Sequence, residues 1–460
     1  MKFIAALVFG AISSFSFEPF GFWPLAFVGL AAWFSLLTQS RLKERILISY
    51  LFGASLLLLN QHWTGIYVGN TPWFILCFSQ AIIFTVPAFF VSKGSKHNNY
   101  LFALSYVLTE LLLRTVPFTG FGWTRLSFTQ VDSPLASSYP IGGVALVALF
   151  LALISSARKI RSLVVALVLA GICWFIPTNI QTERPISIAL VQGGVVNLGL
   201  EFNSKPQEVF KRHLDQSLSS LKQNEVDLVI WPENSVDVDG NTSPTVNGSI
   251  ESLSLSLNTP VLIGAVTKSA EGPRNQSILY NSKKGQTYTK RYLTPFGEYL
   301  PMRSIAEKVS KYSNQITDFK AGDENVVFDV NKIRFNTLIC YELIDDSFVP
   351  EAINDFLVVQ TNNATFGDTN QLDQQINIAR VRALESGRGI AYVSTTGTTA
   401  FITSNGKIDS SLEKFKPATL KGQIIISRGQ TYRQSFGHLI EPFAMIVLVG
   451  LLLLRVRGRS

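Results

Sequence analysis

The sequence predicts an α-helical transmembrane bundle of about eight helices joined to one polar α/β domain. Hydrophobic residues make up 47% of the 460 residues and the mean hydropathy is +0.25, which is too apolar for an ordinary soluble protein. The apolar residues gather in separate segments. One long polar region instead alternates short β-rich runs with amphipathic helical patterns. We therefore expect a protein embedded in lipid that carries a folded domain outside it.

Seven apolar segments precede the polar region and one follows it. They lie at 3–17, 20–37, 46–63, 73–91, 100–113, 135–154, 163–177 and 436–454. Several are shorter than the roughly 20 residues that span a bilayer, so we expect flanking aromatic residues such as Trp23, Trp63 and Trp174 to extend them. The first segment lacks a convincing small-residue cleavage site and leads into further apolar segments, so we expect it to be retained rather than removed as a signal peptide. The predicted domains are a transmembrane bundle at 1–177, a polar domain at 178–435 and a C-terminal transmembrane helix with a basic tail at 436–460.

The positions of Lys and Arg predict how the chain is oriented. Short loops that stay in the cytoplasm collect these residues, and here they cluster at alternate junctions between apolar segments. The clusters are Lys2; Arg41, Lys43 and Arg45; Lys93 and Lys96; Arg158, Lys159 and Arg161; and Arg455, Arg457 and Arg459. The intervening connections carry only Arg114 and Arg125. Both termini are thus predicted to be cytoplasmic and the polar domain extracytoplasmic. Because the basic residues gather in these short clusters and not on one long basic face, the net charge of +8 reflects membrane topology rather than a nucleic-acid partner.

The polar region predicts a layered α/β domain of about 250 residues, which is large enough for its own core. Short runs rich in β-branched residues predict strands at 186–191, 228–231, 261–266, 336–340, 356–360 and 390–394. Helical periodicity predicts amphipathic helices at 207–221 and 372–386.

Three polar sites follow apolar runs in this domain, where α/β folds usually present catalytic groups. Glu233 and Asn234 end the run LVIWPEN at 228–234, Lys290 begins KRYLTPFGEYLP at 290–301, and Cys340 lies in TLICYE at 337–342. Taken singly, these residues are ordinary: a solvated carboxylate, a surface lysine and a small core residue. Cys340 is nevertheless the only thiol of the polar region, because Cys77 and Cys173 lie in apolar segments, so a disulfide framework is excluded there.

Together the three residues supply a base, a cation and a nucleophile, and the chain resembles the nitrilase superfamily, whose Glu, Lys and Cys occur in this order. Within it, PFGEYLP at 295–301, CYE at 340–342 and the N-terminal helical bundle resemble the membrane-embedded branch, the bacterial apolipoprotein N-acyltransferases. Further matches are ALVQG at 189–193, FGD at 366–368, ARVRALE at 379–385 and SFEPFGFWP at 16–24, so the resemblance covers essentially the whole chain. It implies that the protein lies in the bacterial inner membrane. It also implies that the polar domain is an αββα sandwich on the extracytoplasmic face of that membrane.

The resemblance also implies a mechanism. Glu233 takes the proton of Cys340, and the thiolate attacks the ester carbonyl of a phospholipid acyl chain. Lys290 and the backbone N–H after Cys340 hold the oxyanion. The resulting thioester is then attacked by the free α-amine of a diacylglyceryl-apolipoprotein, which completes a ping-pong transfer. The implied partners are the phospholipid donor, the lipoprotein acceptor and membrane lipid; neither a cofactor nor a metal is implied.

Other positions match supporting residues of the family or depart from its pattern. Glu298, Tyr341 and Glu342 match residues needed for activity, and Glu298 is expected to orient Lys290 and keep it charged. Phe366, in the FGD match, is expected to contact substrate.

The departures fall on residues that the family uses near its substrate. Glu201 and Phe202 stand where the family has a Trp, so Phe202 is expected to replace that aromatic ring at the substrate. Asn363 and Thr365 replace an acid and a Trp. We expect both changes to affect how lipid is docked and gated, without removing a member of the Glu, Lys and Cys set.

Histidine is not expected to activate the thiol. Unperturbed cysteine is only a few per cent thiolate at neutral pH, and cysteine enzymes often recruit His to ionise it. The four His residues are His62, His97, His213 and His438. Only His213 lies in the polar domain, on a predicted helix beside Lys211 and Arg212, and we expect it to be a solvated surface side chain. A carboxylate is left as the base.

Three other functions compete with acyl transfer. A membrane-tethered amidase of the nitrilase type would use the same residues but resolve the thioester with water; the eight apolar segments and the CYE run favour transfer. A transporter would carry several intramembrane charges, yet Glu110 is almost the only one, and we expect it to form an i to i+4 ion pair with Arg114. A catalytically inactive scaffold is disfavoured because Glu233, Lys290 and Cys340 are all present.

Overall fold

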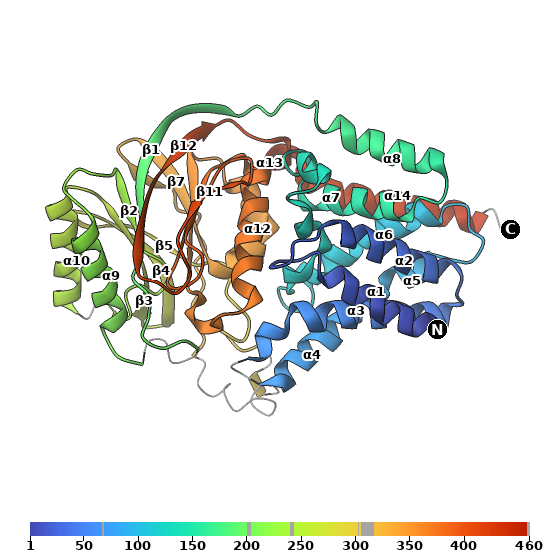
Figure 1. The fold of residues 1–460 in the computed structure, drawn as a ribbon, viewed down its shortest axis with the longest axis horizontal. Coiled ribbons are helices and arrows are strands. Elements are labelled where there is room, and N and C mark those ends of the chain that lie inside the picture. The colour runs from blue at the N-terminus through green and yellow to red at the C-terminus, as the bar shows by residue number, and fades with distance from the viewer. Residues whose placement is uncertain (67–68, 200–203, 240–242, 302, 305–316, 458–460) are drawn as a thin grey trace. The chain divides into compact units, whose positions relative to one another are not determined.

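The computed structural model describes residues 1–66, 69–199, 204–239, 243–301, 303–304 and 317–457 (Figure 1). The chain forms two compact units. A helical unit comprises Met1–Asn179 with Thr431–Ser460, and a sheet unit comprises Ile180–Gln430.

The helical unit is built from apolar helices, as the sequence predicts. Its α-helices are α1 (Lys2–Ser14), α2 (Pro24–Thr38), α3 (Leu42–Asn60), α4 (Asn70–Ala81), α5 (Val86–Phe90), α6 (Asn98–Thr115), α7 (Tyr139–Ser156), α8 (Ile160–Ile172), α13 (Tyr432–Phe436) and α14 (Ile440–Arg457). Among the described residues, three helical stretches are long and apolar enough to cross a membrane: Asn70–Phe90, Pro134–Ser156 and Tyr432–Leu454. Shorter apolar helices lie at Lys2–Ser14, Pro24–Thr38 and Ile160–Ile172. The predicted helical membrane bundle is thereby confirmed as a fold class.

Large apolar side chains cover much of the surface of this unit. Val165 on α8 is 54% exposed, and Phe443 and Ile446 on α14 are 66% and 70% exposed. A surface of this kind is stable in hydrocarbon and unfavourable in water, because each exposed apolar group would order solvent around it. The composition of these helices therefore suits lipid contact.

Close packing inside the helical unit depends on one buried tryptophan and on small residues. The Trp33 ring stacks on Phe52 at 4.7 Å between centroids and lies edge-on to Phe102 at 5.3 Å. Its Nε1 donates to Ser49 Oγ at 3.0 Å, so the one polar atom of the ring is satisfied. A Cβ at Gly10 would lie 2.3 Å from the carbonyl oxygen of Phe52, which shows that α1 and α3 approach too closely for any larger residue.

The ion pair that we expected between Glu110 and Arg114 is not formed. Glu110 is buried on α6 and accepts hydrogen bonds from Tyr106 Oη at 2.8 Å and from the backbone N–H of Ser127 at 3.1 Å. Arg114 pairs instead with Glu441 of α14. The prediction was wrong because Glu110 is satisfied by Tyr106, one turn earlier on α6, and by the backbone N–H and hydroxyl of Ser127 in the segment after α6, whose approach spacing along one helix cannot reveal.

The sheet unit contains two six-stranded sheets within the described residues, in the orders β12-β1-β2-β3-β4-β5 and β11-β10-β9-β8-β7-β6. The strands are β1 (Gln181–Gln192), β2 (Leu228–Ile230), β3 (Val261–Ser269), β4 (Gly272–Asn281), β5 (Lys283–Thr289), β6 (Phe328–Val330), β7 (Ile333–Ile339), β8 (Phe356–Thr361), β9 (Ile390–Ser394), β10 (Ala400–Ile402), β11 (Ile408–Ser411) and β12 (Ala418–Arg428). The centre of each sheet is parallel, with β1-β2-β3 in one and β7-β8-β9 in the other. The outer strands pair antiparallel.

Helices cover the outer face of each sheet. The helices α9 (Glu208–Ser220) and α10 (Pro244–Leu257) lie on one side and α12 (Asn370–Ser386) on the other (Figure 1). Strand β1 shows how the sequence builds this: Ile186, Ile188 and Leu190 join the core between the sheets, while Ala189 and Val191 join the core beneath α9 and α10. The unit is the predicted αββα sandwich, and that prediction is confirmed.

All six strands and both helices predicted for the polar region are present, with ends that differ by a few residues. The sequence analysis did not predict α10 or the antiparallel strands at the sheet edges. Strand β5, for example, reads KKGQTYT and is mostly exposed, so it has neither the apolar run nor the clean alternation that marks a strand in sequence.

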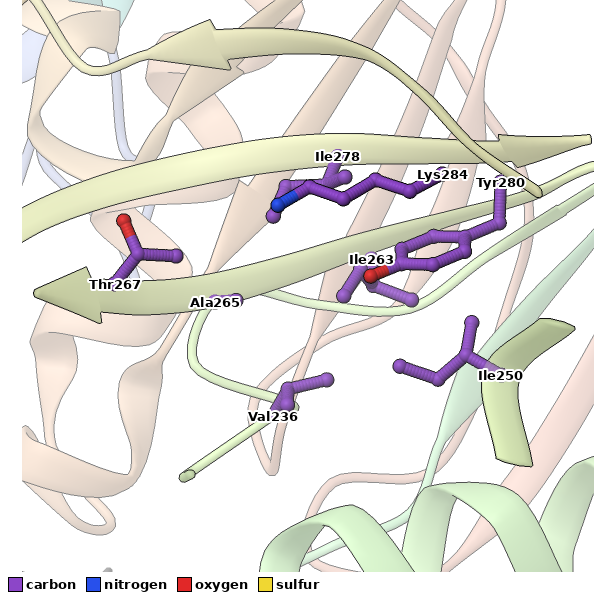
Figure 2. A pocket seen from close by; sticks show the side chains of 8 residues that line it. All are labelled: Val236, Ile250, Ile263, Ala265, Thr267, Ile278, Tyr280 and Lys284. Atoms are coloured by element: carbon purple, nitrogen blue, oxygen red, sulfur yellow. The ribbon is translucent and has the colours of Figure 1, made fainter. Parts of the chain in front are cut away.

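A small cavity lies in the outer core of the first sheet, between α10 and strands β3 and β4 (Figure 2). Apolar side chains such as Ile250, Ile263 and Ile278 line it, with the phenol of Tyr280 at one end (Figure 2). Tyr280 Oη donates to Asn247 Oδ1 at 2.7 Å, so it is already satisfied within the protein. The cavity is therefore a packing gap of the core, distinct from the polar site described next.

Candidate active site

Glu233, Lys290 and Cys340 each follow the end of a strand, and the fold brings them together. Glu233 lies three residues after β2, Lys290 directly after β5 and Cys340 directly after β7. Lys290 Nζ is 3.7 Å from Glu233 Oε1, and both charges act on the Cys340 sulfur. Strands β2 and β7 belong to different sheets, so the residues meet where the two sheets face each other.

Glu233 is held by two amide donors. It is 5% exposed, and its Oε1 accepts from Asn275 Nδ2 at 2.7 Å while its Oε2 accepts from the backbone N–H of Asn362 at 2.8 Å. Asn275 lies on β4 and Asn362 follows β8, so both sheets fix this one carboxylate. Such a carboxylate has a defined orientation and can accept a proton without a rearrangement of its own.

Lys290 is fully buried and bound to a second carboxylate. Its Nζ lies 2.8 Å from Glu298 Oε2 and donates to Thr294 Oγ1 at 3.2 Å. Glu298 Oε1 in turn accepts from Asn275 Nδ2 at 2.8 Å, the same amide that binds Glu233. Lys290 is thus fixed between two carboxylates, and its contact with Glu298 is the one that the sequence analysis expected.

Cys340 occupies a strained backbone position. Its φ is +51°, in the left-handed region that residues with a Cβ seldom adopt, and the chain changes there from β7 into a 3-10 turn over Cys340–Ile344. The sulfur is partly buried, and Gln375 Nε2 on α12 lies 3.4 Å from it. The turn places the thiol beyond the end of strand β7, at the edge of the sheet.

Glu342 joins the Cys340 turn to the chain around Lys290. One carboxylate oxygen accepts from Tyr288 Oη at 2.7 Å and from the backbone N–H of Arg291 at 2.7 Å. The other accepts from the backbone N–H of Ile339 at 2.8 Å. Because these donors flank Lys290 on one side and Cys340 on the other, Glu342 fixes the distance between cation and nucleophile.

The remaining predicted site residues lie around this centre. Tyr341 is buried and its ring stacks on Tyr292 at 5.5 Å between centroids. Phe366 ends a 3-10 turn over Asn363–Phe366 and is partly buried. Phe202 lies outside the described residues. Substrate contact by Phe202 and Phe366 therefore stays a prediction.

Burial controls the proton affinities of the nucleophile and of Glu233. It raises the pKa of the Cys340 thiol to about 12, and the negative charge of Glu233 adds to that shift. Burial likewise raises the pKa of Glu233, with the charge of Lys290 acting in the opposite direction. At neutral pH the resting sulfur is a thiol, so it needs a base that removes the proton as the bond to carbon forms.

The Lys290 and Glu298 pair is held in its charged form. Burial alone lowers the pKa of Lys290, but the carboxylates of Glu298 and Glu233 outweigh it and raise that pKa. Burial alone raises the pKa of Glu298, yet the charge of Lys290 and the hydrogen bond from Asn275 lower it overall. A permanent ammonium group beside the thiol can stabilise an oxyanion throughout the neutral pH range.

His213 is buried rather than solvated, so the sequence prediction for it was wrong. It is 0% exposed on α9, its Nδ1 lies 2.8 Å from the carbonyl oxygen of Val209, and its ring lies 5.8 Å from that of Trp231. Burial lowers its pKa to about 4. The two flanking basic residues suggested solvent exposure, but one face of an amphipathic helix is always inward. His213 lies in the core between α9 and the first sheet. It therefore does not serve as the base, and a carboxylate remains in that role.

Three polar residues of the site, Asn275, Asn362 and Gln375, carry no signal in the sequence that would predict them. Each lies in a strand or helix or directly after one, but amide side chains are common in any sequence and their spacing does not mark them as functional. Only the meeting of β4, β8 and α12 shows that these amides contact Glu233 and Cys340. Among the described residues, no group of three or more His, Cys, Asp and Glu is placed to hold a metal ion.

Comparison with known proteins gives two family matches. Residues 187–434 match the model of the carbon-nitrogen hydrolase family, and residues 9–157 match the apolipoprotein N-acyltransferase N-terminal domain. Curated relatives named apolipoprotein N-acyltransferase are 27% identical in Haemophilus ducreyi, over 95% of this chain and 93% of that protein, and 27% identical in Vibrio cholerae, over 94% and 92%. The relative from Mycolicibacterium smegmatis is also 27% identical, over 98% of this chain and 84% of that protein. Together with the apolar helices, these matches identify a membrane protein.

Solved structures similar to the chain cover about half of it. A carbon-nitrogen hydrolase superfamily protein from Xanthomonas campestris, with an arsenic adduct in its active site, is 18% identical over 53% of this chain and 91% of that one, with a TM-score of 0.41. An amidase of the nitrilase superfamily from Nesterenkonia is 16% identical over 55% and 95%, with a TM-score of 0.40.

Proposed function

This chain belongs to the carbon-nitrogen hydrolase family, and from that premise we propose that it is an apolipoprotein N-acyltransferase that works through a thioester on Cys340. One observation supports the chemistry above all others. A buried, oriented carboxylate and a buried ammonium lie 3.7 Å apart, and both act on the same sulfur. A base, a cation and a nucleophile gathered at one site are the groups that acyl transfer through cysteine needs.

The first half-reaction acylates the enzyme. Glu233 takes the Cys340 proton while the sulfur attacks the ester carbonyl of a phospholipid acyl chain. Lys290 and the backbone N–H of Tyr341 bind the oxygen that becomes negatively charged. The ester C–O bond then breaks, a lysophospholipid leaves with the proton returned by Glu233, and a thioester remains.

The second half-reaction transfers the acyl group to protein. The α-amine of a diacylglyceryl-cysteine at the N-terminus of a lipoprotein attacks the thioester and Glu233 takes the amine proton. The C–S bond then breaks, and Glu233 passes that proton to the sulfur, which restores the thiol and the carboxylate. Glu298 keeps Lys290 charged, while Glu342 and Tyr341 hold the turn that presents Cys340. Phe202 and Phe366 are assigned to substrate contact.

The membrane arrangement is part of the same proposal. It comprises a transmembrane bundle at 1–177, a catalytic domain at 178–435 on the extracytoplasmic face, and a final transmembrane helix with its basic cytoplasmic tail at 436–460. The alternation of Lys and Arg clusters supports this orientation. The donor phospholipid is a membrane lipid, and the acceptor lipoprotein would be held in the membrane by its diacylglyceryl group. An enzyme that joins them therefore benefits from being in the membrane.

The acyl-enzyme can be tested with purified protein in detergent and a phospholipid labelled in its acyl chain. We expect a label that hydroxylamine releases, and we expect Cys340→Ser to lose it. Cys173→Ser is the matched control, because Cys173 is a second buried cysteine outside the site, and it should keep the label. A hydroxylamine-labile label that persists in Cys340→Ser would reject the mechanism.

The acceptor distinguishes transfer from hydrolysis. Addition of a diacylglyceryl peptide with a free N-terminus should move the label onto the peptide, whereas the same peptide with an acetylated N-terminus should leave it on the enzyme. Release of the label only as free fatty acid would identify a membrane-bound hydrolase instead.

The orientation can be tested with a membrane-impermeant thiol reagent on intact cells. Thr245→Cys places a thiol at an exposed position in the first turn of α10 and should react from outside. Lys96→Cys places one at an exposed position just before α6 and should react only after lysis. The opposite pattern would reverse the proposed topology.

A further inference from the structure

Gln375 contacts the sulfur from the side of α12 and is itself held by several donors. It is 0% exposed, and its Nε2 lies 3.4 Å from Cys340 Sγ. Its Oε1 accepts from Asn363 Nδ2 at 2.8 Å, Thr361 Oγ1 at 3.0 Å, Tyr392 Oη at 3.0 Å and Gln371 Nε2 at 3.3 Å. Within the part of the chain that the structure describes, the sulfur is the acceptor available to Nε2. The two amide donors, Asn363 Nδ2 and Gln371 Nε2, cannot accept a hydrogen bond, so a reversed Gln375 amide would set N–H groups against them.

The direction of these hydrogen bonds is fixed from the backbone. The N–H of Gly397, which can only donate, binds Ser394 Oγ at 2.8 Å. The backbone N–H of Thr396 binds the same oxygen at 3.4 Å and occupies its second lone pair, so the Ser394 hydroxyl donates its own proton onward, to Asn363 Oδ1 at 2.7 Å. This identifies the other end of the Asn363 amide as Nδ2, the donor to Gln375 Oε1. Gln375 consequently presents N–H, and not C=O, to Cys340.

We propose that Gln375 stabilises negative charge on the Cys340 sulfur, and that Asn363 and Ser394 are positioning residues that keep its N–H directed there. The inference rests on the proposed thioester chemistry and adds a third group to it, besides Glu233 and Lys290.

Charge on sulfur appears twice in the cycle. The S–H proton passes to Glu233 as the C–S bond forms, and the sulfur takes back the electron pair of that bond when the amine displaces it. Gln375 keeps both of its protons and only donates a hydrogen bond. A thiol is a weak acceptor and a thiolate a strong one, so the contact strengthens as the charge develops. A chain of aligned donors polarises its last member further.

The position of Asn363 also bears on the departure noted in the sequence. Asn363 is 1% exposed and its amide is used within this chain of hydrogen bonds. An acid at this position has no proton to donate to Gln375 at neutral pH. The amide is therefore matched to a glutamine at 375, and the two residues act as one unit.

Gln375→Glu is the direct test, because it keeps size and oxygen but replaces the N–H group by a negatively charged oxygen. We expect the rate at which iodoacetamide alkylates Cys340, followed by mass spectrometry of its peptide, to fall about tenfold or more at pH 7.5, and the pH profile to move to higher pH. Asn377→Asp is the matched control: it makes the same amide-to-acid change on the same helix, but its side chain faces Arg380 at 3.3 Å and is expected to change the rate less than about twofold.

Asn363→Asp tests the direction of the chain with Gln375 intact. Its carboxylate accepts from Gln375 and draws the N–H away from the sulfur, so alkylation should slow in the same direction as for Gln375→Glu. Thermal melting identifies variants that fail to fold, and if Gln375→Glu is one of them, Asn363→Asp decides. Unchanged alkylation in a folded variant overturns the inference. If the unmodified protein forms no acyl-enzyme while alkylation still responds, the proposed function fails and the assignment of Gln375 stands.

Discussion

Glu233→Gln is expected to lower the single-turnover rate of acyl-enzyme formation by about 10² to 10⁴ while the protein stays folded, because general-base catalysis contributes about that factor. Burial raises the pKa of the Cys340 thiol to about 12, so little thiolate forms without a base. The replacement is nearly isosteric and keeps a carbonyl oxygen for one of the two donors, Asn275 or the N–H of Asn362. Lys290 keeps its 2.8 Å contact with Glu298, so the cation remains in place.

The pH dependence of the unmodified protein provides the control. Burial raises the pKa of Glu233 above its usual 4.5, so the base becomes protonated, and inactive, at a higher pH than an exposed carboxylate would. The acylation rate should therefore fall on the acid side with a midpoint above 4.5. The residual rate of Glu233→Gln should lack this acid limb. A variant that keeps both the rate and the limb would show that another group is the base.

Lys290→Met is expected to abolish acyl-enzyme formation and also to destabilise the sheet unit by about 3 to 5 kcal/mol, the cost of leaving buried charge without its partner. Lys290 lies between Glu233 and Glu298, and all three residues are at most 8% exposed. Without the ammonium group, two carboxylates share the Asn275 amide with no cation between them. The measurement is thermal or denaturant unfolding beside the labelling assay.

A second substitution separates the two roles of Lys290. Adding Glu298→Gln to Lys290→Met removes one of the unpaired charges, so stability should recover in part. Activity should not recover, because the oxyanion still lacks its cation. Return of acyl-enzyme formation in the double variant would mean that Lys290 only neutralises Glu298 and does not act on the substrate.

Gln375 illustrates how function can depend on residues without a motif. Its neighbour in the mechanism, Cys340, was visible as the only thiol of the polar region. Gln375 lies on a helix rich in amides, and nothing in that run separates it from Gln371 or Gln374. Its importance follows from the 3.4 Å contact with sulfur and from donors on β8, on β9 and in the turn over Asn363–Phe366.

The sequence by itself determined the two-part architecture, because burial in lipid and burial between sheets both leave strong local patterns. Long apolar segments and short apolar runs such as LVI at 228–230 can be recognised in the sequence without knowing which residues pack against them. It also predicted Glu233, Lys290 and Cys340 as the reactive residues, because they follow apolar runs in the order in which the nitrilase superfamily has its Glu, Lys and Cys.

Only the tertiary structure decided which polar groups meet. Glu110 binds Tyr106 and Ser127 rather than Arg114, and His213 is buried rather than solvated. Asn275 binds two carboxylates from different segments of the chain. Hydrogen bonds and ion pairs depend on distances of about 3 Å between residues far apart in sequence, and no periodicity along the chain encodes those distances.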